Sequence, residues 1–230
     1  MLVRIRCAIS NCYLLLGERP VLVDTGAPGD LKRILHTLRK HQVKPKDLAL
    51  ILLTHGHSSH AGCAAELRRR SQAPIALHAA DAALVKNGEN GVLAATSPLA
   101  RFIRPFVDEP FEGFEPDQAF RDGFPLDPYG VKGTVLATPG HTPGSSSVVL
   151  ASGEALIGDV LRGSIVWPNK ASPHFFCNDP ERNTRSIVRL AREGLLRCHP
   201  GNFGSFPGSE LGRFLSTGSG EVLELSGEAV

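Results

Sequence analysis

Three histidines fall within six positions of the segment ILLTHGHSSHAG, residues 51–62. The apolar run before them is typical of a buried β-strand, so His55 and His57 follow at its carboxyl end. Side chains alternate along an extended segment, and these two imidazoles therefore lie on one side, where both can bind one ion. His60 turns onto the start of the next helix and faces a neighbouring position. Because neutral imidazole is the commonest protein ligand for ions such as zinc, the cluster predicts metal binding.

Further candidate ligands follow downstream, each on a separate element: His141 in TPGH, Asp159 in IGDV and His199 in CHPGN. Open α/β sheets build their sites from residues at strand ends, so these side chains can converge on the histidine cluster. A carboxylate such as Asp159 can bridge two ions. Asp24 in VDTG is either a simple turn former or a carboxylate that orients a ligand histidine. We interpret His174 as an ordinary loop residue, although its place after the Asp159 strand could bring it to a substrate.

The elements that must position these residues alternate between strand and helix. Short β-rich segments and buried apolar runs predict strands at 3–8, 12–16, 20–26, 48–53, 74–77, 133–141, 146–152, 154–160 and 194–202. Apolar residues at helical spacing predict helices near 31–38, 63–70, 79–86, 182–192 and 209–215. This alternation indicates the α/β class.

Residues 87–129 interrupt the alternation with NGENG, six prolines and a group of phenylalanines. Loops of this length in compact domains are usually binding lids or disordered segments, and the phenylalanines favour a lid. We therefore expect one domain over residues 1–216, with 87–129 as a lid or insertion. Residues 217–230 are expected to be a C-terminal tail that is partly frayed.

The composition is that of an ordinary globular chain, with 230 residues, 42% hydrophobic residues, 21% charged residues and a formal net charge of only +2. Basic residues are scattered, which argues against nucleic-acid binding and against a membrane-surface patch. No apolar stretch approaches the roughly 20 residues of a membrane span. The five cysteines form no C-x-x-C pair, and a reduced cytoplasmic location fits them best.

Five motifs in series, VDTG, THGHSSHAG, TPGHTPGS, IGDV and CHPGNFG, resemble those of the metallo-β-lactamase superfamily. The spacing is most similar to that of the small glyoxalase II-like hydrolases. The resemblance implies a four-layer αβ/βα sandwich of two similar halves, with a metal site at the edge where the two sheets meet. It also implies one or two divalent metal ions, with zinc as the first choice and iron or manganese as alternatives.

Carried over to this chain, the resemblance assigns the ligands residue by residue. The first metal would be held by His55, His57 and His141, Asp159 would be the bridging and catalytic carboxylate, and the second metal would use His60 and His199.

The family pattern H-x-H-x-D-H has Ser59 in place of its aspartate. A serine hydroxyl is neutral and a poor zinc ligand, so the second site loses a negative charge that would help to hold a dication. We therefore expect Ser59 to lie beside the ligands and the second ion to bind more weakly than the first.

Three functions remain open. The leading hypothesis is a hydrolase of a small ester, thioester or lactone that uses a metal-bound hydroxide as nucleophile. The resemblance also allows an iron-dependent sulfur (persulfide) dioxygenase. The third hypothesis is a metal-binding protein whose turnover is reduced or lost because of Ser59. All three hypotheses involve a small-molecule or metal ligand, and none involves nucleic acid or a membrane. A homo-oligomer is left open.

Overall fold

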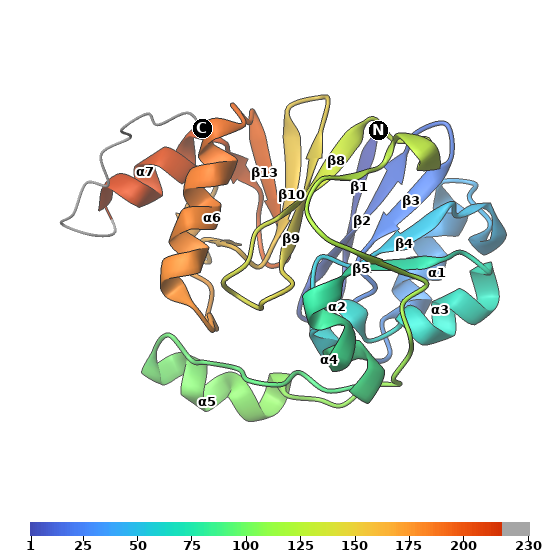
Figure 1. Ribbon diagram of the computed structural model, residues 1–230, viewed down its shortest axis with the longest axis horizontal. Helices are drawn as coiled ribbons and strands as arrows, with labels where there is room; N and C mark the ends of the chain where they lie inside the picture. The colour runs from blue at the N-terminus through green and yellow to red at the C-terminus, as the bar shows by residue number, and fades with distance from the viewer. Residues whose placement is uncertain (218–230) are drawn as a thin grey trace.

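Two β-sheets face each other in the computed structural model, which describes residues 1–217 (Figure 1). Within these residues the first sheet has six strands in the order β1 (Leu2–Arg6), β2 (Asn11–Leu16), β3 (Pro20–Val23), β4 (Leu50–Leu52), β5 (Ile75–His78) and β6 (Gln118–Phe120). The three pairs from β3 to β6 are parallel, and the two pairs from β1 to β3 are antiparallel. Nearly all of the tail predicted at 217–230 lies outside the described residues.

The second sheet also has six strands within the described chain. Their order is β14 (Phe206–Pro207), β13 (Arg197–Pro200), β10 (Glu154–Gly158), β9 (Ser146–Leu150), β8 (Gly133–Ala137) and β7 (Phe124–Pro125). β10 and β13 are parallel, and the other neighbours are antiparallel. A short pair, β11 (Arg162–Gly163) and β12 (Ala171–Ser172), stands apart.

Helices cover the outer face of each sheet, as Figure 1 shows. The α-helices are α1 (Leu31–Lys40), α2 (Ser58–Ala61), α3 (Ala64–Ser71), α4 (Ala82–Asn87), α5 (Pro98–Val107), α6 (Pro180–Arg192) and α7 (Ser209–Thr217). Short 3₁₀ turns are η1 (Pro45–Asp47), η2 (Ala79–Asp81) and η3 (Asp127–Tyr129). α1 and α3 pack on the first sheet, and α6 and α7 pack on the second, which gives the expected four-layer αβ/βα sandwich.

The alternation of apolar side chains explains these layers. Leu14 and Leu22 point toward the helices of the first half and join one buried cluster. Leu15 and Val21, their neighbours in sequence, point the other way and pack between the two sheets. Because strands of the first sheet are buried on both faces, they are apolar at nearly every position.

The segment 87–129 contains more regular structure than its sequence predicts. α5 begins at Pro98, where a missing backbone N–H costs nothing, and the Ser97 hydroxyl accepts a hydrogen bond from the Ala100 amide. The segment then ends in β6 and β7, which form the outer strands of the two sheets. The prediction of a long loop over residues 87–129 is therefore wrong in part, because Ser and Pro at a helix start are also typical of loops. Its role as a lid and the domain limits stay predictions.

Among residues 1–217, no helix has both the length and the apolar character that a membrane crossing requires.

Candidate metal centre

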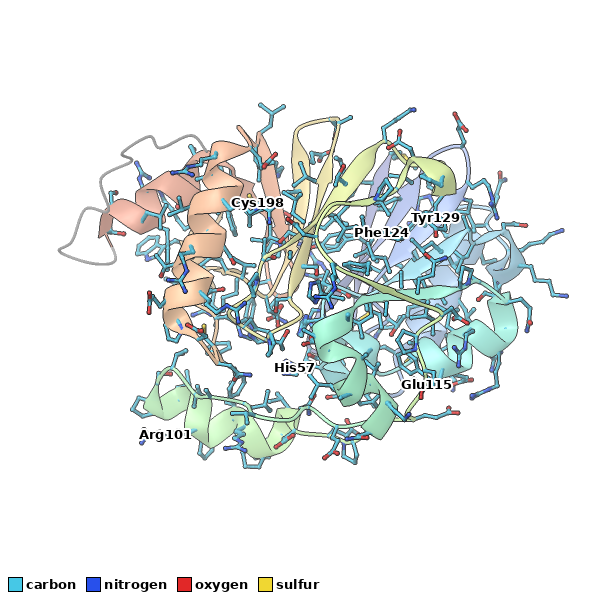
Figure 2. The ribbon with its side chains drawn as sticks, viewed as in Figure 1. His57, Arg101, Glu115, Phe124, Tyr129 and Cys198 are labelled. Atoms are coloured by element: carbon cyan, nitrogen blue, oxygen red, sulfur yellow. The ribbon has the colours of Figure 1, made fainter. Side chains whose placement is uncertain are left out.

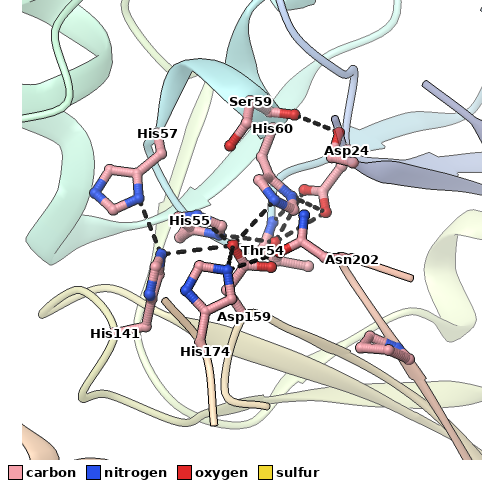
Figure 3. A network of polar contacts seen from close by, with 12 residues as sticks. Asp24, Thr54, His55, His57, Ser59, His60, His141, Asp159, His174 and Asn202 are labelled. Atoms are coloured by element: carbon pink, nitrogen blue, oxygen red, sulfur yellow. Dashed lines mark hydrogen bonds and ion pairs between the residues drawn. The ribbon is translucent and has the colours of Figure 1, made fainter. Parts of the chain in front are cut away.

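The loop after β4 and the short helix α2 carry the three clustered histidines. β4 ends at Leu52, so His55 and His57 lie beyond the edge of the sheet, and α2 begins directly after His57. The backbone amide of His60 donates to the His57 carbonyl at 2.9 Å, which starts the helix, and the centre of the His60 ring lies 4.2 Å from that of His55. All three side chains are buried. The local sequence therefore delivers three imidazoles to one end of the first sheet (Figure 3).

The loop after β8 brings His141 to the same place. His141 Nε2 lies 2.9 Å from His57 Nδ1, and these two nitrogens and a nitrogen of His55 all lie within 4.8 Å of one another. Figure 2 shows His57 on the side of the molecule that faces α5, the helix that carries Arg101. This trio of nitrogens is the first candidate metal site, and its members are those that the sequence predicts.

Asp24 and Thr54 contact the Nδ1 atoms of His60 and His55. Asp24 Oδ2 lies 2.8 Å from His60 Nδ1, and Asp24 Oδ1 accepts a hydrogen bond of 2.8 Å from the Thr54 amide. The Thr54 hydroxyl donates to Asp24 at 2.9 Å and lies 3.1 Å from His55 Nδ1. Because the Nδ1 atoms of His55 and His60 are engaged in this way, their Nε2 atoms point inward, as metal-binding histidines require.

Asp159 stands at the centre of the histidines, directly after β10. Its Oδ2 lies 3.4 Å from His60 Nε2, 3.6 Å from His141 Nε2 and 3.9 Å from His55 Nε2. A Cβ at Gly201 would lie 2.2 Å from Asp159 Oδ1 and 2.5 Å from His60 Cε1. Glycine at this position therefore leaves the room that the carboxylate and the imidazole occupy.

Asp81 joins the two loops that carry the first trio. This buried carboxylate accepts hydrogen bonds from the Gly56 amide at 2.9 Å, the Gly144 amide at 2.7 Å and the Thr142 hydroxyl at 2.7 Å. Burial raises the pKa of Asp81, although these donors favour its ionised form. Nothing near Asp81 in the chain indicates these partners, so the sequence alone does not identify it.

The histidines of the cluster fall into two groups, one with lowered and one with raised pKa values. Burial lowers the pKa of His57 to about 3 and also lowers the pKa values of His55 and His141 well below the usual range. These rings are neutral at pH 7 and can donate a lone pair to an ion. Burial also acts against charge on His60, but the carboxylates of Asp159 and Asp24 outweigh it and raise the pKa of His60 to about 10. His60 therefore keeps its proton at pH 7 until an ion displaces it.

The side chains fit a divalent metal ion. The buried atoms His55 Nε2, His60 Nε2 and Asp159 Oδ1 have no hydrogen-bond partner among the described residues. Buried polar atoms are normally paired, so such atoms that converge on one point indicate a ligand. Imidazole nitrogens with one carboxylate suit zinc, iron and manganese.

The structure places His199 away from this cluster. Its Nε2 lies 3.1 Å from Glu154 Oε1, its Nδ1 lies 2.8 Å from the Ser205 hydroxyl, and its ring packs against Tyr13. The physical reason is that His199 lies within β13, whereas the converging ligands follow the ends of their strands. We therefore do not assign His199 to the site.

Two other residues occupy that side of the site. His174 Nε2 lies 3.1 Å from Asp159 Oδ2 and 2.7 Å from Asn202 Oδ1. The interpretation of His174 as an ordinary loop residue is therefore wrong, and Asn202, which follows the end of β13 in the HPGN turn, is a site residue that no sequence signal indicates. Ser59 lies at the cavity wall, and its carbonyl accepts a hydrogen bond of 2.6 Å from the Ser10 hydroxyl.

A cavity of about 790 Å³ opens onto the cluster, and its wall includes His57, His141, Asp159 and His174. The remaining lining is largely apolar and comes from residues 4–11, from α5 and from the segments around residues 165, 175 and 203. Pockets of this size and character are typical of small-molecule sites.

The chain belongs to the metallo-beta-lactamase superfamily, whose sequence pattern matches residues 5–182. Among curated proteins it is similar to the probable metallo-hydrolase YflN of Bacillus subtilis, with 29% identity over 226 residues that cover 83% of this chain and 80% of that protein. It is also similar to the probable metallo-hydrolase MJ0888 of Methanocaldococcus jannaschii, with 26% identity over 66% of this chain and 67% of that one.

Solved structures agree with this assignment. The metallo-beta-lactamase family protein TTHA1429 of Thermus thermophilus superposes with a TM-score of 0.70 and 24% identity over 94% of this chain and 78% of that chain. A second structure, TTHA1623 in a di-iron-bound form, gives a TM-score of 0.68 and 25% identity over 93% of this chain and 97% of its own. The fold is therefore that of the superfamily.

Proposed function

We propose that this protein is a metal-dependent hydrolase of a small ester, thioester or lactone, similar to the glyoxalase II-like enzymes. The observation that carries the proposal is the convergence of neutral nitrogens from His55, His57 and His141 beside a cavity large enough for a small substrate. Zinc is the ion that we expect there, because neutral imidazoles are its usual ligands, and iron or manganese are the alternatives.

The chemistry divides between the ion and the chain. His55, His57 and His141 would hold a divalent ion, which would supply Lewis acidity and could lower the pKa of water to about 7. The chain supplies orientation: Asp24 and Thr54 hold the rings of His60 and His55. Asp159 Oδ1, which is buried without a partner among the described residues, is placed to accept a hydrogen bond from the attacking water.

The cavity wall supports a substrate with an apolar acyl group. Ile103 and Phe106 on α5 and Phe175 and Phe203 on facing loops line it, so an alkyl or aryl group would leave water on binding. Arg4 lines the same cavity and suits a carboxylate or phosphate at the far end of the substrate.

Hydrolysis assays with defined metal content test the proposal. The zinc-loaded protein is expected to hydrolyse members of an ester, thioester and lactone panel, to lose this activity with a chelator and to regain it with zinc. The exposed His36 of α1 provides the matched control, since His36→Ala removes an imidazole outside the site. A metal-loaded protein that turns over no member of the panel would contradict the proposal.

A persulfide dioxygenase is the second candidate. Two groups in the site, His55 with His60 and Asp159, and His141 with Asp159 and His174, each combine two histidines with one carboxylate. Iron(II) oxygenases use two histidines and one carboxylate with open positions on the metal. Oxygen uptake by the iron-loaded protein with glutathione persulfide would support this activity, and no uptake would exclude it.

The cellular setting forms part of the proposal. All five cysteines are free thiols, and even Cys7 Sγ and Cys12 Sγ, 3.3 Å apart, form no disulfide. Free thiols suit a reducing compartment such as the cytoplasm. We expect a small-molecule substrate as the partner, with no nucleic acid or membrane. Thiol titration of the purified protein after denaturation should find five reactive groups.

A further inference from the structure

Asp159 has more histidines around it than the first trio uses. Its Oδ2 lies 3.1 Å from His174 Nε2 and 3.4 Å from His60 Nε2, and neither histidine belongs to the trio. Both rings are fully buried or nearly so. A carboxylate between two sets of imidazoles can hold one ion on each side, so the side that faces His174 can take an ion of its own.

His174 Nδ1 contacts the backbone of Phe176, and His174 Nε2 faces Asp159 and Asn202. His174 Nδ1 lies 3.0 Å from the Phe176 carbonyl oxygen and 3.2 Å from the Phe176 amide nitrogen. When Nδ1 carries the proton and donates to this carbonyl, the lone pair of Nε2 faces Asp159. A backbone carbonyl behind Nδ1 is the arrangement in which metal-binding histidines are held, and His141 Nδ1 lies 2.8 Å from the same oxygen.

Asn202 adds an oxygen on the same side. Its Nδ2 donates to the Ile9 carbonyl at 2.9 Å, which fixes the amide so that Oδ1 points to His174 Nε2 at 2.7 Å. His174 Nε2 is therefore in contact with two possible ligand oxygens, Asn202 Oδ1 and Asp159 Oδ2. A proton on His174 satisfies them in the metal-free protein, and a divalent ion can replace this proton.

The residues that the family pattern assigns to a second ion are missing or turned away. Ser59 stands in place of the aspartate, and His199 is engaged by Glu154 and Ser205. We infer that this chain builds its second metal site from Asp159, His174 and Asn202, beside His60, instead of the usual set. The inference concerns metal binding and holds whether or not the bound metal supports the hydrolysis proposed above.

The donor set also predicts how strongly the two ions bind. Asp159 is the only carboxylate in the metal-ligand groups found in residues 1–217, and Asn202 brings no charge. The second site therefore attracts a dication less strongly than a site with two carboxylates would. We expect two ions per chain in excess zinc, of which one is lost first on dialysis.

Metal counting with single variants tests the inference. Elemental analysis after equilibration with excess zinc should find about two ions in the parent protein and about one in His174→Ala and in Asn202→Ala. Cobalt(II) titration gives a second readout, because the visible absorption of the second equivalent should disappear in both variants and that of the first should remain. His199→Ala is the matched control and should keep both ions.

Several outcomes would overturn the inference. A parent protein that binds only one ion, or a His174→Ala variant that keeps two, would show that His174 is a hydrogen-bonding residue and no ligand. Loss of an ion in His199→Ala would show that His199 is a ligand of the second ion, as the family pattern implies. If His174→Ala fails to fold by circular dichroism, the longer His174→Gln side chain serves in its place under the same criteria. Because metal content is measured directly, failure of the hydrolase assays does not affect the result.

Discussion

The two sides of the metal centre are assembled in different ways. On the N-terminal side, His55, His57 and His60 lie within six residues, and all three follow one strand. On the C-terminal side, His141, Asp159, His174 and Asn202 come from four separate segments, each beyond the end of a strand or within a loop. The first side is therefore set by local structure, whereas the second depends on how distant segments pack.

The same contrast appears in the electrostatics. Burial lowers the pKa values of His55, His57 and His141, so the first trio is neutral and ready for an ion. Carboxylates raise the pKa values of His60 and of His174, in both cases against the effect of burial. An ion that takes a nitrogen from His60 must first displace a proton. One cluster of histidines can therefore offer a strong metal site and a weaker one beside it.

The largest effect is expected on removal of a ligand from the first trio. His57→Ala should lower kcat/KM about 10³-fold, because a catalytic ion contributes several kcal/mol and each 1.36 kcal/mol is tenfold in rate. Initial rates on the best substrate of the panel measure this, with His36→Ala as the control. A fall of less than tenfold in metal-loaded His57→Ala would place the catalytic ion elsewhere.

A smaller loss, of metal affinity, is expected when the carboxylate that contacts His60 is neutralised. Asp24→Asn removes the charge and the Oδ2 acceptor that hold His60, while the amide oxygen can still accept from Thr54, and it should weaken metal binding 10–100-fold, roughly the usual effect of such partners. Competition with a chromophoric chelator measures the affinity. Asp30→Asn is the control, since Asp30 is equally buried but binds the amides of Ala8 and Ala27 instead of a histidine. Equal losses in both variants would indicate a general structural effect.

A negative charge at position 59 should bring the metal affinity of the second site closer to that of the first. Ser59→Asp should tighten binding of the second ion about tenfold, because Coulomb attraction of a few kcal/mol is partly offset by desolvation. The neutral Ser59→Asn is the control and should leave the affinity nearly unchanged. Hydrolysis rates are read in parallel: a large gain indicates activity limited by Ser59, and tighter binding without a gain indicates different chemistry.

The smallest effect is a difference in proton release. Uptake of the first ion at pH 7 should release no proton from its histidines, since the pKa of His57 is about 3. An ion that binds His60 Nε2 should release about one proton, since the pKa of His60 is about 10, and this release should vanish above that pH. Calorimetry in two buffers of different ionisation enthalpy measures both, and His60→Gln should remove the part of the second release that comes from His60, leaving the proton that the ion displaces from His174. Equal release for both ions would remove the electrostatic distinction.

Much of this architecture follows from the sequence because its signals are local. Near-continuous apolar runs predict strands buried on both faces, and the histidine cluster after β4 predicts His55 and His57, two of the three members of the first trio, without knowledge of any distant segment. The motif series also indicates the superfamily. The same local reasoning missed α5, since Pro98 and Ser97 are typical of both loops and helix starts.

The tertiary structure decided what lies opposite the cluster. It turned His199 toward Glu154, placed His174 and Asn202 beside Asp159, and joined two ligand loops through Asp81. A sequence shows which residues follow a strand, but the direction of each side chain depends on where the strand ends and what packs against it. For this protein, residue types and spacing therefore determined the family and half of the metal centre, and only the packing of distant loops decided the other half.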